Sequence, residues 1–512
     1  MGLFIFVFLF QFLQASEFIK NYDDYKDDYW LYEAYIVCEI YQIQTSKDWD
    51  CPTSFEENSG ITYESQESSY ASDAEVKVAS LNSLKLGARP YKNLTLMAKM
   101  FNQWDIVSVL EIMSPGQSSP TQKLNRRLMT ILKNSENPEE IKKYADVFVL
   151  PAYLILLEEL QKLDPSWSLT IGSHPTGNYT NRETIGIYYR ASKVKNIETP
   201  LCEYEGKSCY VNLETKNDNL HNRFVEYVAR GVFASEFKVG NNNMTVVAMH
   251  TRFGAYRSIF LTDLRRYYFK KQFEDFEDEE DLIQIEDMLN SKFETSRYFE
   301  MSIVAGRIAE YIRQRSLDDQ HKNIMWLGDF NLPTQYESGD DYAYYWRLLF
   351  RSHWGLGDYN IFVDTPTTYG DSGLASSYDH FIFDTDRIDF CDAESAHAYN
   401  FIDPEEDESS EDYLEYLKDF HGKMNAISSK GELKDYFLDS KPDSVTFFGM
   451  TLKDFIERKD EDNNELFDRE YLDKELTDYY EKFILNFQSG NYSSLTEVMS
   501  DHLPIVMNCS GD

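Results

Sequence analysis

Basic residues are scarce in this sequence of 512 residues, which carries 50 Lys and Arg against 88 Asp and Glu and has a formal net charge of −38. A chain this acidic repels phosphate on average, so a small basic nucleic-acid-binding module is excluded. Hydrophobic residues make up 42% of the chain and aromatic residues 15%, which excludes disorder over the whole length. The length predicts two or three domains, or one large α/β domain with insertions.

The acidic residues are concentrated in three segments. Residues 17–76 carry a net charge of −12, residues 271–290 carry −8 and residues 391–490 carry −16. Residues 77–270, by contrast, carry a net charge of +8. The net charge of the whole chain therefore does not decide which partners the protein can bind.

The sequence also lacks a hydrophobic run of the roughly twenty residues that a membrane-spanning helix needs. Its N-terminal apolar run covers only about ten residues, which is the length of the hydrophobic region of a secretory signal peptide, and small Ala15 follows as a cleavage position. We expect residues 1–15 to be a signal peptide; a buried N-terminal strand or helix is the alternative. The mature protein is then secreted or resides in the lumen of the secretory pathway, with no stable membrane insertion.

Neither a Cys-x-x-Cys pair nor the Cys/His spacing of a zinc site is present. The six cysteines instead fit an oxidising compartment, in which they pair as disulfides. The spacing favours the pairs Cys202–Cys209 and Cys38–Cys51, which would leave Cys391 for Cys509. Sequons for N-glycosylation support secretion only weakly, because a chain of this size contains several by chance. They begin at Asn93, Asn178, Asn243, Asn491 and Asn508.

Hydrophobic periodicity separates an acidic N-terminal arm, residues 16–75, from a region of alternating strands and helices, residues 76–512. The arm shows no sustained period, so we expect it to be extended. Two acidic, Tyr-rich and mostly helix-like segments, at about 255–297 and 391–490, are expected to be surface insertions. Strands outnumber helices, which predicts a sheet-based α/β domain. We expect strands at 75–82, 105–111, 167–171, 184–189, 226–237, 244–250, 323–327, 378–383 and 503–507, and helices at 93–104, 151–163 and 298–315.

Several of the expected strands have polar residues at their ends, where an apolar run stops. Strand ends that meet at one edge of a sheet form binding and catalytic sites. Carboxylates can hold a hard divalent cation, amides can orient a phosphate, and histidines can transfer protons or stabilise negative charge, so the set predicts a phosphoesterase site. The residues are Asn82, Glu111, His250, Asp329, Asn331, Asp379, Asp501 and His502.

Six short motifs, each at a strand end, carry a resemblance to a known family. They are Ala79–Asn82, Val107–Glu111, Ala248–Thr251, Trp326–Asn331, Ser377–Ile382 and Ser500–Ile505. In type and order they resemble the motifs of the endonuclease/exonuclease/phosphatase superfamily, including its Gly-Asp-Phe-Asn and Ser-Asp-His-x-Pro signatures. The resemblance implies a four-layer α-β-β-α sandwich of two mostly antiparallel sheets flanked by helices, here with two acidic insertions.

Two further segments are similar to the pancreatic deoxyribonuclease-like branch of that superfamily. Arg182-Glu183, with Arg190 seven residues after Glu183, resembles its Lys-Glu…Tyr-Arg stretch, and Arg230 resembles the arginine of its Arg-x-x-Phe segment near the scissile phosphate. Asn181 departs from the branch, which carries at that position a tyrosine that stacks on DNA. An ordinary salt bridge between Glu183 and Arg190 is the alternative explanation of the first segment.

The resemblance also implies a role for each residue of the site. In the family each catalytic histidine is steered by a carboxylate, which fixes its tautomer and raises its pKa. Here these pairs would be His250 with Glu183 and His502 with Asp379, and Asp329 would orient or deprotonate the attacking water. The metal ligands would be Glu111 and Asp501, the phosphate ligands Asn82, Asn331 and Arg230, and the catalytic groups His250, His502, Asp329, Asp379 and Glu183.

A secreted endonuclease that hydrolyses DNA with Mg²⁺ or Mn²⁺ is the function that the resemblance implies. The first alternative is a phosphoesterase of the same fold that acts on a phospholipid such as sphingomyelin, or on an inositol phosphate. A lipid enzyme should expose an apolar loop beside the site, and no loop of the sequence is clearly apolar. The second alternative, a catalytically silent binding protein, is disfavoured because no expected catalytic residue is replaced. The acidic insertions also offer carboxylates for structural Ca²⁺.

Overall fold

The structure is a computed structural model. It describes residues 29–45, 59–65, 70, 75–87, 92–113, 128, 137–177, 182–203, 206–214, 225, 228–255, 283–285, 288–289, 291–315, 323–334, 342–354, 357–363, 365–370, 373–406, 408–439, 452–457 and 469–511.

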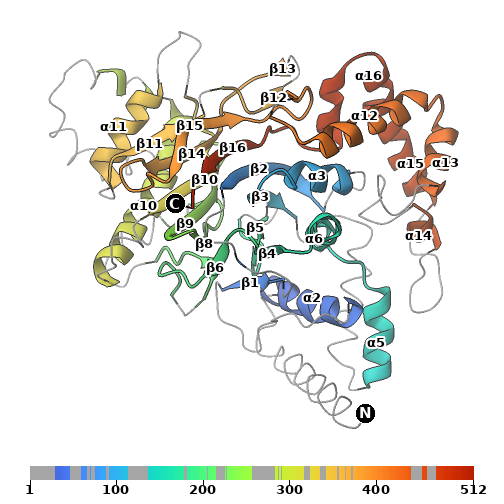
Figure 1. Cartoon of the computed structure of the whole chain (residues 1–512), viewed down its shortest axis with the longest axis horizontal. Coiled ribbons are helices and arrows are strands. Elements are labelled where there is room, and N and C mark those ends of the chain that lie inside the picture. The colour runs from blue at the N-terminus through green and yellow to red at the C-terminus, as the bar shows by residue number, and fades with distance from the viewer. Residues whose placement is uncertain are drawn as a thin grey trace.

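Two seven-stranded sheets lie at the centre of the molecule (Figure 1). The first sheet has the strand order β1–β4–β5–β3–β2–β16–β15, and among its described strands only β2 and β3 pair in parallel. Its strands are β1 (Gly60–Tyr63), β2 (Val76–Leu86), β3 (Ile106–Ile112), β4 (Trp167–Gly172), β5 (Thr184–Arg190), β15 (Cys391–Ala398) and β16 (Ile505–Cys509).

The second sheet has the order β11–β14–β10–β9–β8–β6, with β7 also paired to β8. Its parallel pair is β9–β10, and its other described pairs are antiparallel. Its strands are β6 (Lys195–Ile197), β7 (Ser208–Tyr210), β8 (Phe233–Val239), β9 (Asn242–His250), β10 (Ile324–Asp329), β11 (Tyr359–Phe362) and β14 (Asp379–Asp384). A separate hairpin joins β12 (Tyr369–Gly370) to β13 (Gly373–Leu374).

Alternating side chains on the strands fill the spaces on both faces of each sheet. In β2, Val78 points into the cluster between the two sheets, while the next residue, Ala79, joins the cluster under the helices of the first sheet. In β10, Leu327 lies between the sheets and Trp326 packs under the helices of the second sheet. This period of two is what a strand buried on both faces requires.

Helices cover the outer face of each sheet. On the first sheet these are α3 (Leu94–Phe101) and α6 (Ala152–Leu163), and on the second α10 (Lys292–Arg315) and α11 (Tyr342–Trp354). Helix α3 begins where the Asn93 side-chain oxygen accepts a hydrogen bond from the Leu96 amide (3.0 Å), and seven of its eight residues are buried. The expected four-layer sandwich of mostly antiparallel sheets is therefore confirmed. None of the helices in the described part of the chain is long and apolar enough to cross a membrane.

The N-terminal arm differs from the extended chain that we expected. It contains a helix, α2 (Tyr29–Thr45), and strand β1, which pairs antiparallel with β4 at the edge of the first sheet. Val37 and Tyr41 of α2 are fully buried in the core of that layer. The sequence hid α2 because its many apolar and aromatic residues are spread around the helix and show no strong helical period.

The segment 391–490 is also more than a surface insertion. Its first eight residues form β15, and its helix α12 (Glu411–Ala426) packs against α3 through side chains that belong to the main core. The remaining elements lie at the upper right of Figure 1. They are α13 (Lys430–Asp439), α14 (Leu452–Glu457), α15 (Arg469–Tyr479), the π-helical turn η4 (Tyr480–Ile484), α16 (Leu485–Gln488) and the 3₁₀ turn η5 (Tyr492–Glu497). Most of the other insertion, residues 255–297, lies outside the described residues.

Disulfides join Cys202 to Cys209 and Cys391 to Cys509, as the spacing predicted. Cys38 is also disulfide-bonded, but the partner that we expected, Cys51, lies outside the described residues. The sequon at Asn93 is buried and caps α3, so a glycan there is incompatible with the folded chain. The expected signal peptide, Asn178 and Asn181 also lie outside the described residues.

Candidate active site

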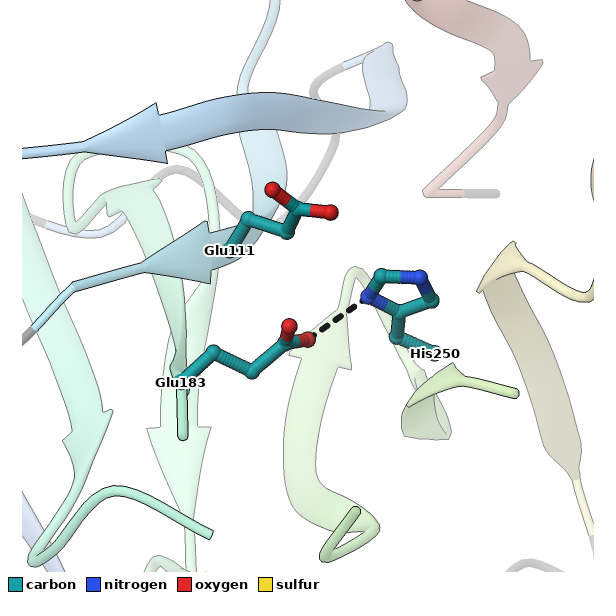
Figure 2. Close-up of side chains that lie close together, drawn as sticks. All are labelled: Glu111, Glu183 and His250. Carbon is teal, nitrogen blue, oxygen red and sulfur yellow. Dashed lines mark hydrogen bonds and ion pairs between the residues drawn. The ribbon is translucent and has the colours of Figure 1, made fainter. Parts of the chain in front are cut away.

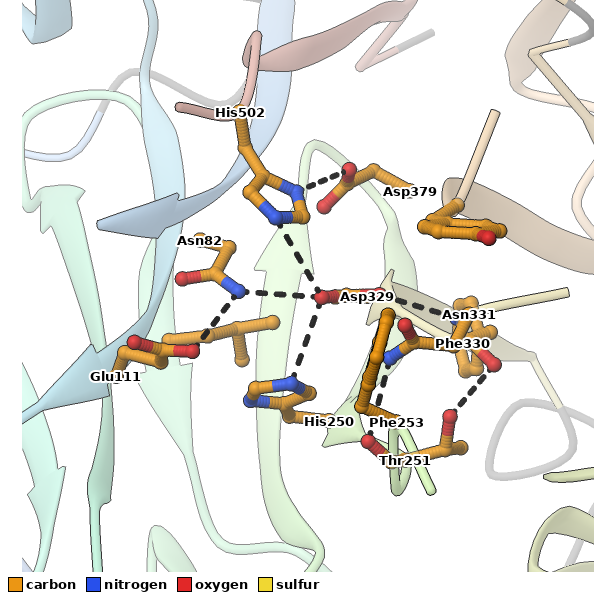
Figure 3. Close-up of polar contacts among 12 residues, drawn as sticks. Asn82, Glu111, His250, Thr251, Phe253, Asp329, Phe330, Asn331, Asp379 and His502 are labelled. Atoms are coloured by element: carbon orange, nitrogen blue, oxygen red, sulfur yellow. Dashed lines mark hydrogen bonds and ion pairs between the residues drawn. The ribbon is translucent and has the colours of Figure 1, made fainter. Parts of the chain in front are cut away.

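The polar residues at the strand ends converge at one end of the two sheets (Figure 3). The first sheet contributes Asn82 from β2 and Glu111 from β3, and the second sheet contributes His250 from β9 and Asp329 from β10. The parallel pairing of β9 with β10 sets Asp329 directly opposite His250. The site is therefore built across the interface between the sheets.

The first histidine–carboxylate pair joins His250 to Glu183 (Figure 2). Because an ionised carboxylate can only accept, the Nδ1–H of His250 donates to Glu183 Oε1, at 2.7 Å. The other carboxylate oxygen, Oε2, forms an ion pair with Arg230 Nε at 2.8 Å. Arg230 also donates from Nη1 to the carbonyl of Thr251 (3.0 Å), so the pair and the loop after β9 are held together.

Arg190 does not pair with Glu183, which removes the alternative of an ordinary salt bridge between them. Its guanidinium forms ion pairs with Asp105 (3.6 Å) and Asp164 (3.3 Å). Glu183 therefore pairs with His250, as the resemblance implied, and with Arg230.

The second pair joins His502 to Asp379. His502 Nδ1–H donates to Asp379 Oδ2 at 2.7 Å, and the hydroxyl of Thr367 donates to the same oxygen at 2.7 Å. The loop that carries His502 is fixed by Ser500, whose hydroxyl donates to the carbonyl of Asn82 and accepts the His502 amide (3.0 Å). His502, in the loop before β16 of the first sheet, therefore pairs with Asp379 on β14 of the second sheet.

Asp329 lies between the two histidines. Its Oδ2 is 3.4 Å from His250 Nε2 and 3.8 Å from His502 Nε2. Asn82 Nδ2 donates to the same oxygen at 3.1 Å, and the Asn331 amide donates to Oδ1 at 3.0 Å. One carboxylate oxygen thus faces both imidazoles and an amide, with only 3% of Asp329 exposed to solvent.

The histidines carry shifted pKa values in this arrangement. Burial opposes the charge of His502, but the carboxylates of Asp379, Asp329 and Asp501 outweigh it and raise its pKa to about 10. Burial also opposes the charge of His250, and there Glu183 and Asp329 raise the pKa despite the nearby Arg230. The pKa of Asp329 is lowered, because the two histidines overcome the effect of burial. An ionised Asp329 between two protonated imidazoles is the charge state that these directions favour.

Asn82 links Asp329 to Glu111. Its second Nδ2 hydrogen bond goes to Glu111 Oε1 (3.3 Å), and its own oxygen accepts the Leu84 amide (3.1 Å). Glu111 adopts a left-handed φ of 55° at a register shift in the pairing of β3 with β5. Residues other than glycine seldom take this conformation, and it is commonly held at functional sites.

The backbone geometry requires a glycine at the first position of the Gly-Asp-Phe-Asn motif. Gly328 has a φ of +138°, and a Cβ added there would lie 2.1 Å from the carbonyl oxygen of Met249 on the neighbouring strand. A side chain at this position would push β10 away from β9. Gly328 therefore keeps Asp329 and His250 in register.

Two groups of side chains offer ligand atoms that lie within 4.8 Å of one another: Glu111, Glu183 and His250, and Asp329, Asp379 and His502. Asp501, which we expected to be a metal ligand with Glu111, belongs to neither group in the described part of the chain. Its Oδ1 is nevertheless buried without a hydrogen-bond partner there, and Glu111 is partly exposed. Carboxylate oxygens left available in this way are the donors that Mg²⁺ and Mn²⁺ take.

Helix α10 braces the loops of the site from behind. Arg297, which is only 3% exposed, donates from Nη1 to the carbonyl of Asn331 (2.6 Å) and from Nη2 to that of Phe253 (2.9 Å). Three residues along, fully buried Glu300 accepts the amides of Ala229 (2.7 Å) and Arg252 (3.3 Å). One face of α10 thus holds the loops that precede β8 and follow β9 and β10.

The structure brings together most of the residues that the sequence singled out. Asn82, Glu111, Glu183, Arg230, His250, Asp329, Asn331, Asp379 and His502 are joined by the contacts described above, and Asp501 lies near His502. Sequence reasoning missed Thr367, Arg297, Glu300 and Phe253. No motif marks these residues, because their roles depend on contacts with segments distant in sequence.

No family model matches the chain, and no curated protein matches it. Among solved structures it is similar to a conserved protein of unknown function from Enterococcus faecalis V583, with 11% identity and a TM-score of 0.30 over 63% of this chain and 90% of the other. It is also similar to an endonuclease/exonuclease/phosphatase family protein from Bacteroides thetaiotaomicron, with 12% identity and a TM-score of 0.28 over 64% of this chain and 86% of the other. A third similar structure is an AP endonuclease from Leishmania major, with 12% identity and a TM-score of 0.28 over 63% of this chain and 81% of the other. Likenesses this distant do not bear on the substrate.

Proposed function

We propose that this chain is a divalent-metal-dependent phosphodiester hydrolase of the endonuclease/exonuclease/phosphatase superfamily, and that it is an endonuclease with DNA as its substrate. The proposal rests on one observation above all: two histidine–carboxylate pairs converge on a single oxygen, Oδ2 of Asp329. Structural ion pairs do not need two imidazoles around one buried carboxylate, whereas attack on a phosphodiester uses such a group.

The reaction is the in-line attack of water on phosphorus: a P–O bond to the water oxygen forms as the P–O bond to the leaving sugar oxygen breaks. The water gives its proton to Asp329, and the leaving oxygen takes a proton from solvent or from a protonated histidine. Asp329 accepts a hydrogen bond from the water and directs it, because its Oδ2 is the acceptor that both imidazoles face. Protonated His502 and His250 then stabilise the negative charge that gathers on the phosphoryl oxygens, and Asp379 and Glu183 keep them protonated. Asn82 fixes the orientation of Asp329, while Arg230 Nη2, which has no hydrogen-bond partner among the described residues, is available to a phosphate.

Glu111 and Asp501 would hold Mg²⁺ or Mn²⁺ in this proposal, with Asn82 beside them. The ion would act as a Lewis acid that offsets charge on the phosphate. Asn82 keeps one oxygen of Glu111 oriented through its hydrogen bond, and Asp501 brings a buried oxygen that has no hydrogen-bond partner in the described region.

The compartment in this proposal is extracellular or the lumen of the secretory pathway. Two disulfides within the described residues are compatible with an oxidising environment. The N-terminal apolar run of the sequence supports entry into that pathway.

The decisive experiment incubates the purified protein with plasmid DNA, RNA, sphingomyelin vesicles and inositol phosphates, each with Mg²⁺, with Mn²⁺ or with EDTA. We expect cleavage of DNA that depends on the metal. His502→Ala should lower the rate ~10²–10⁴-fold, because it removes a group that stabilises the transition state. His397→Ala is the matched control, since this histidine lies on β15 outside the site, and it should leave the rate unchanged.

Circular dichroism must show that both variants are folded. Hydrolysis of the lipid or of inositol phosphate without cleavage of DNA would refute the proposed substrate. Near-full activity of a folded His502→Ala variant would refute the assigned mechanism.

A further inference from the structure

Phe253 is the most exposed large hydrophobic side chain in the described part of the chain, with 68% of its surface open to solvent. It lies three residues after His250, in the loop that follows β9. Its backbone carbonyl and that of Asn331 both accept hydrogen bonds from Arg297 (2.9 and 2.6 Å), which places the loop of Phe253 beside the segment that follows Asp329 (Figure 3). An aromatic face is therefore presented to solvent next to the groups that would act on a phosphodiester.

The Phe253 ring is held in place rather than left on a free loop. Arg297 donates from Nη2 to the Phe253 carbonyl (2.9 Å), and its guanidinium lies 5.6 Å from the centre of the Phe253 ring. The same guanidinium donates to the carbonyl of Asn331, and the Thr251 amide donates to the carbonyl of Asp329 (3.0 Å). The position of the ring is thereby coupled to Asp329 and Asn331.

We propose that Phe253 stacks on an unpaired base next to the scissile phosphate, so that the protein prefers single-stranded or locally unpaired nucleic acid. This inference rests on the proposed function. Every base has a π-face, so one fixed ring binds a strand without demanding a sequence. In a continuous duplex the bases already stack on one another, and a base must leave that stack before it can pack on Phe253.

The surroundings of the ring fit a nucleotide better than a lipid surface. The residues on either side of Phe253 are Arg252 and Gly254, which add no apolar area for insertion into a bilayer. A second exposed ring, Phe293, lies 5.7 Å from the buried guanidinium of Arg297, so two exposed aromatic rings lie near the same arginine. The flat face of a base complements exposed aromatic rings of this kind.

The test compares three substitutions at Phe253 on single-stranded and duplex oligonucleotides of the same sequence. Phe253→Ala should raise KM for single strands roughly 5- to 150-fold, because it removes the binding free energy of stacking on a base, and it should affect kcat less. Phe253→Leu keeps an apolar side chain but has no aromatic face, so it should resemble Phe253→Ala. Phe253→Trp should retain the affinity of the natural protein. Leu485→Ala, at an exposed apolar residue of α16, is the matched control and should change nothing.

Single strands with one abasic nucleotide at successive positions identify the contacted base. At one position near the cleavage site, removal of the base should raise the KM of the natural protein. On that abasic strand, Phe253→Ala should raise KM no further. An equal effect of Phe253→Ala on single strands and duplexes, or full activity of Phe253→Leu, would overturn the inference. So would a loss of binding to sphingomyelin vesicles with unchanged cleavage of single strands.

The natural protein serves as the reference that separates the two proposals. If it cleaves no nucleic acid under any metal condition, the proposed function fails. If it cleaves nucleic acid and Phe253→Ala cleaves single strands equally well, only the role of Phe253 fails.

Discussion

At the scale of single residues, the neighbours of a side chain decide its chemistry. His502 and His397 are the same residue type, yet the carboxylates of Asp379 and Asp329 overcome the effect of burial and raise the pKa of His502 to about 10, whereas His397 lies partly exposed on β15, outside the site. The sequence next to each histidine does not reveal these different surroundings. It arises because residues 329, 379 and 502 meet in space.

The raised pKa of His502 makes the stability of the protein depend on pH. A histidine in an unfolded chain has a pKa near 6.5. The pairing with Asp379 therefore stabilises the fold fully below that pH, and the contribution is lost as the pH rises through about 10. We expect Asp379→Asn to lower the unfolding temperature most in mildly acidic buffer and progressively less toward pH 10.

Asp384→Asn is the matched control for this prediction. Asp384 lies at the other end of β14, away from the two histidines of the site, and forms an ion pair with an arginine, Arg387 (3.5 Å). Its effect on the unfolding temperature should not vary over the same pH range. If Asp379→Asn lowers the unfolding temperature by the same amount at every pH, the Asp379–His502 pair is not charged.

At the scale of elements, α10 shows how a helix away from the reacting groups can set their positions. The sequence predicted a helix over 298–315, whereas the structure has it from Lys292, so Arg297 falls inside its first turns. The earlier start brings Arg297 and Glu300 onto one face, where they hold three loops. The periodicity of the sequence alone did not reveal this face.

Glu300→Ala should lower kcat/KM about 10²-fold, because a small displacement of the loops that carry Arg230 and Arg252 misplaces catalytic groups. Glu300→Gln keeps one acceptor oxygen and should fall between this variant and the natural protein. The measurement is steady-state cleavage together with thermal unfolding. Burial raises the pKa of Glu300, so the variants are compared at one neutral pH.

Glu310→Gln provides the control on the same helix. Glu310 pairs with Arg307 at 2.8 Å, much as Glu300 pairs with Arg252 (3.3 Å), but Glu310 is partly exposed and lies nearly three turns beyond Glu300. It should leave kcat/KM unchanged. Equal effects of Glu300→Ala and Glu310→Gln would show that α10 matters for stability alone.

At the scale of the whole molecule, the acidic segments are built into the fold. Removal of 391–490 would delete strand β15, the Cys391–Cys509 disulfide and the part of the core formed by α12. Deletion therefore cannot separate the charge of this segment from its structural role. Replacing exposed carboxylates by amides can do so.

Glu405→Gln, Glu406→Gln and Glu415→Gln combined should tighten DNA binding roughly two- to fivefold at low salt, because three exposed negative charges no longer repel the phosphates. The gain should vanish at physiological ionic strength, where the screening length is about 8 Å. Fluorescence anisotropy with EDTA present measures binding without cleavage. An affinity that is unchanged at low salt would place these carboxylates away from the bound DNA.

Local sequence patterns were enough to predict the sheet-based fold and most of the candidate site. Buried strands need alternating apolar residues, and the site motifs pair a short apolar run with a fixed polar residue such as Asn82, Glu111 or Asp329. These are local patterns, and the chain displays them directly. The expected strands and the order of the site residues follow from them.

The packing of the two sheets and their loops sets which side chains are in contact. It assigned Glu183 to His250 and Arg230 instead of Arg190, placed α2 and β1 of the acidic arm in the core layer, and joined the loops of Phe253 and Asn331 through Arg297. Each of these contacts joins segments far apart in the sequence or depends on how loops fold over the sheet ends. Their energies come from burial and from charge at short distance, which exist only once the two sheets have packed against each other.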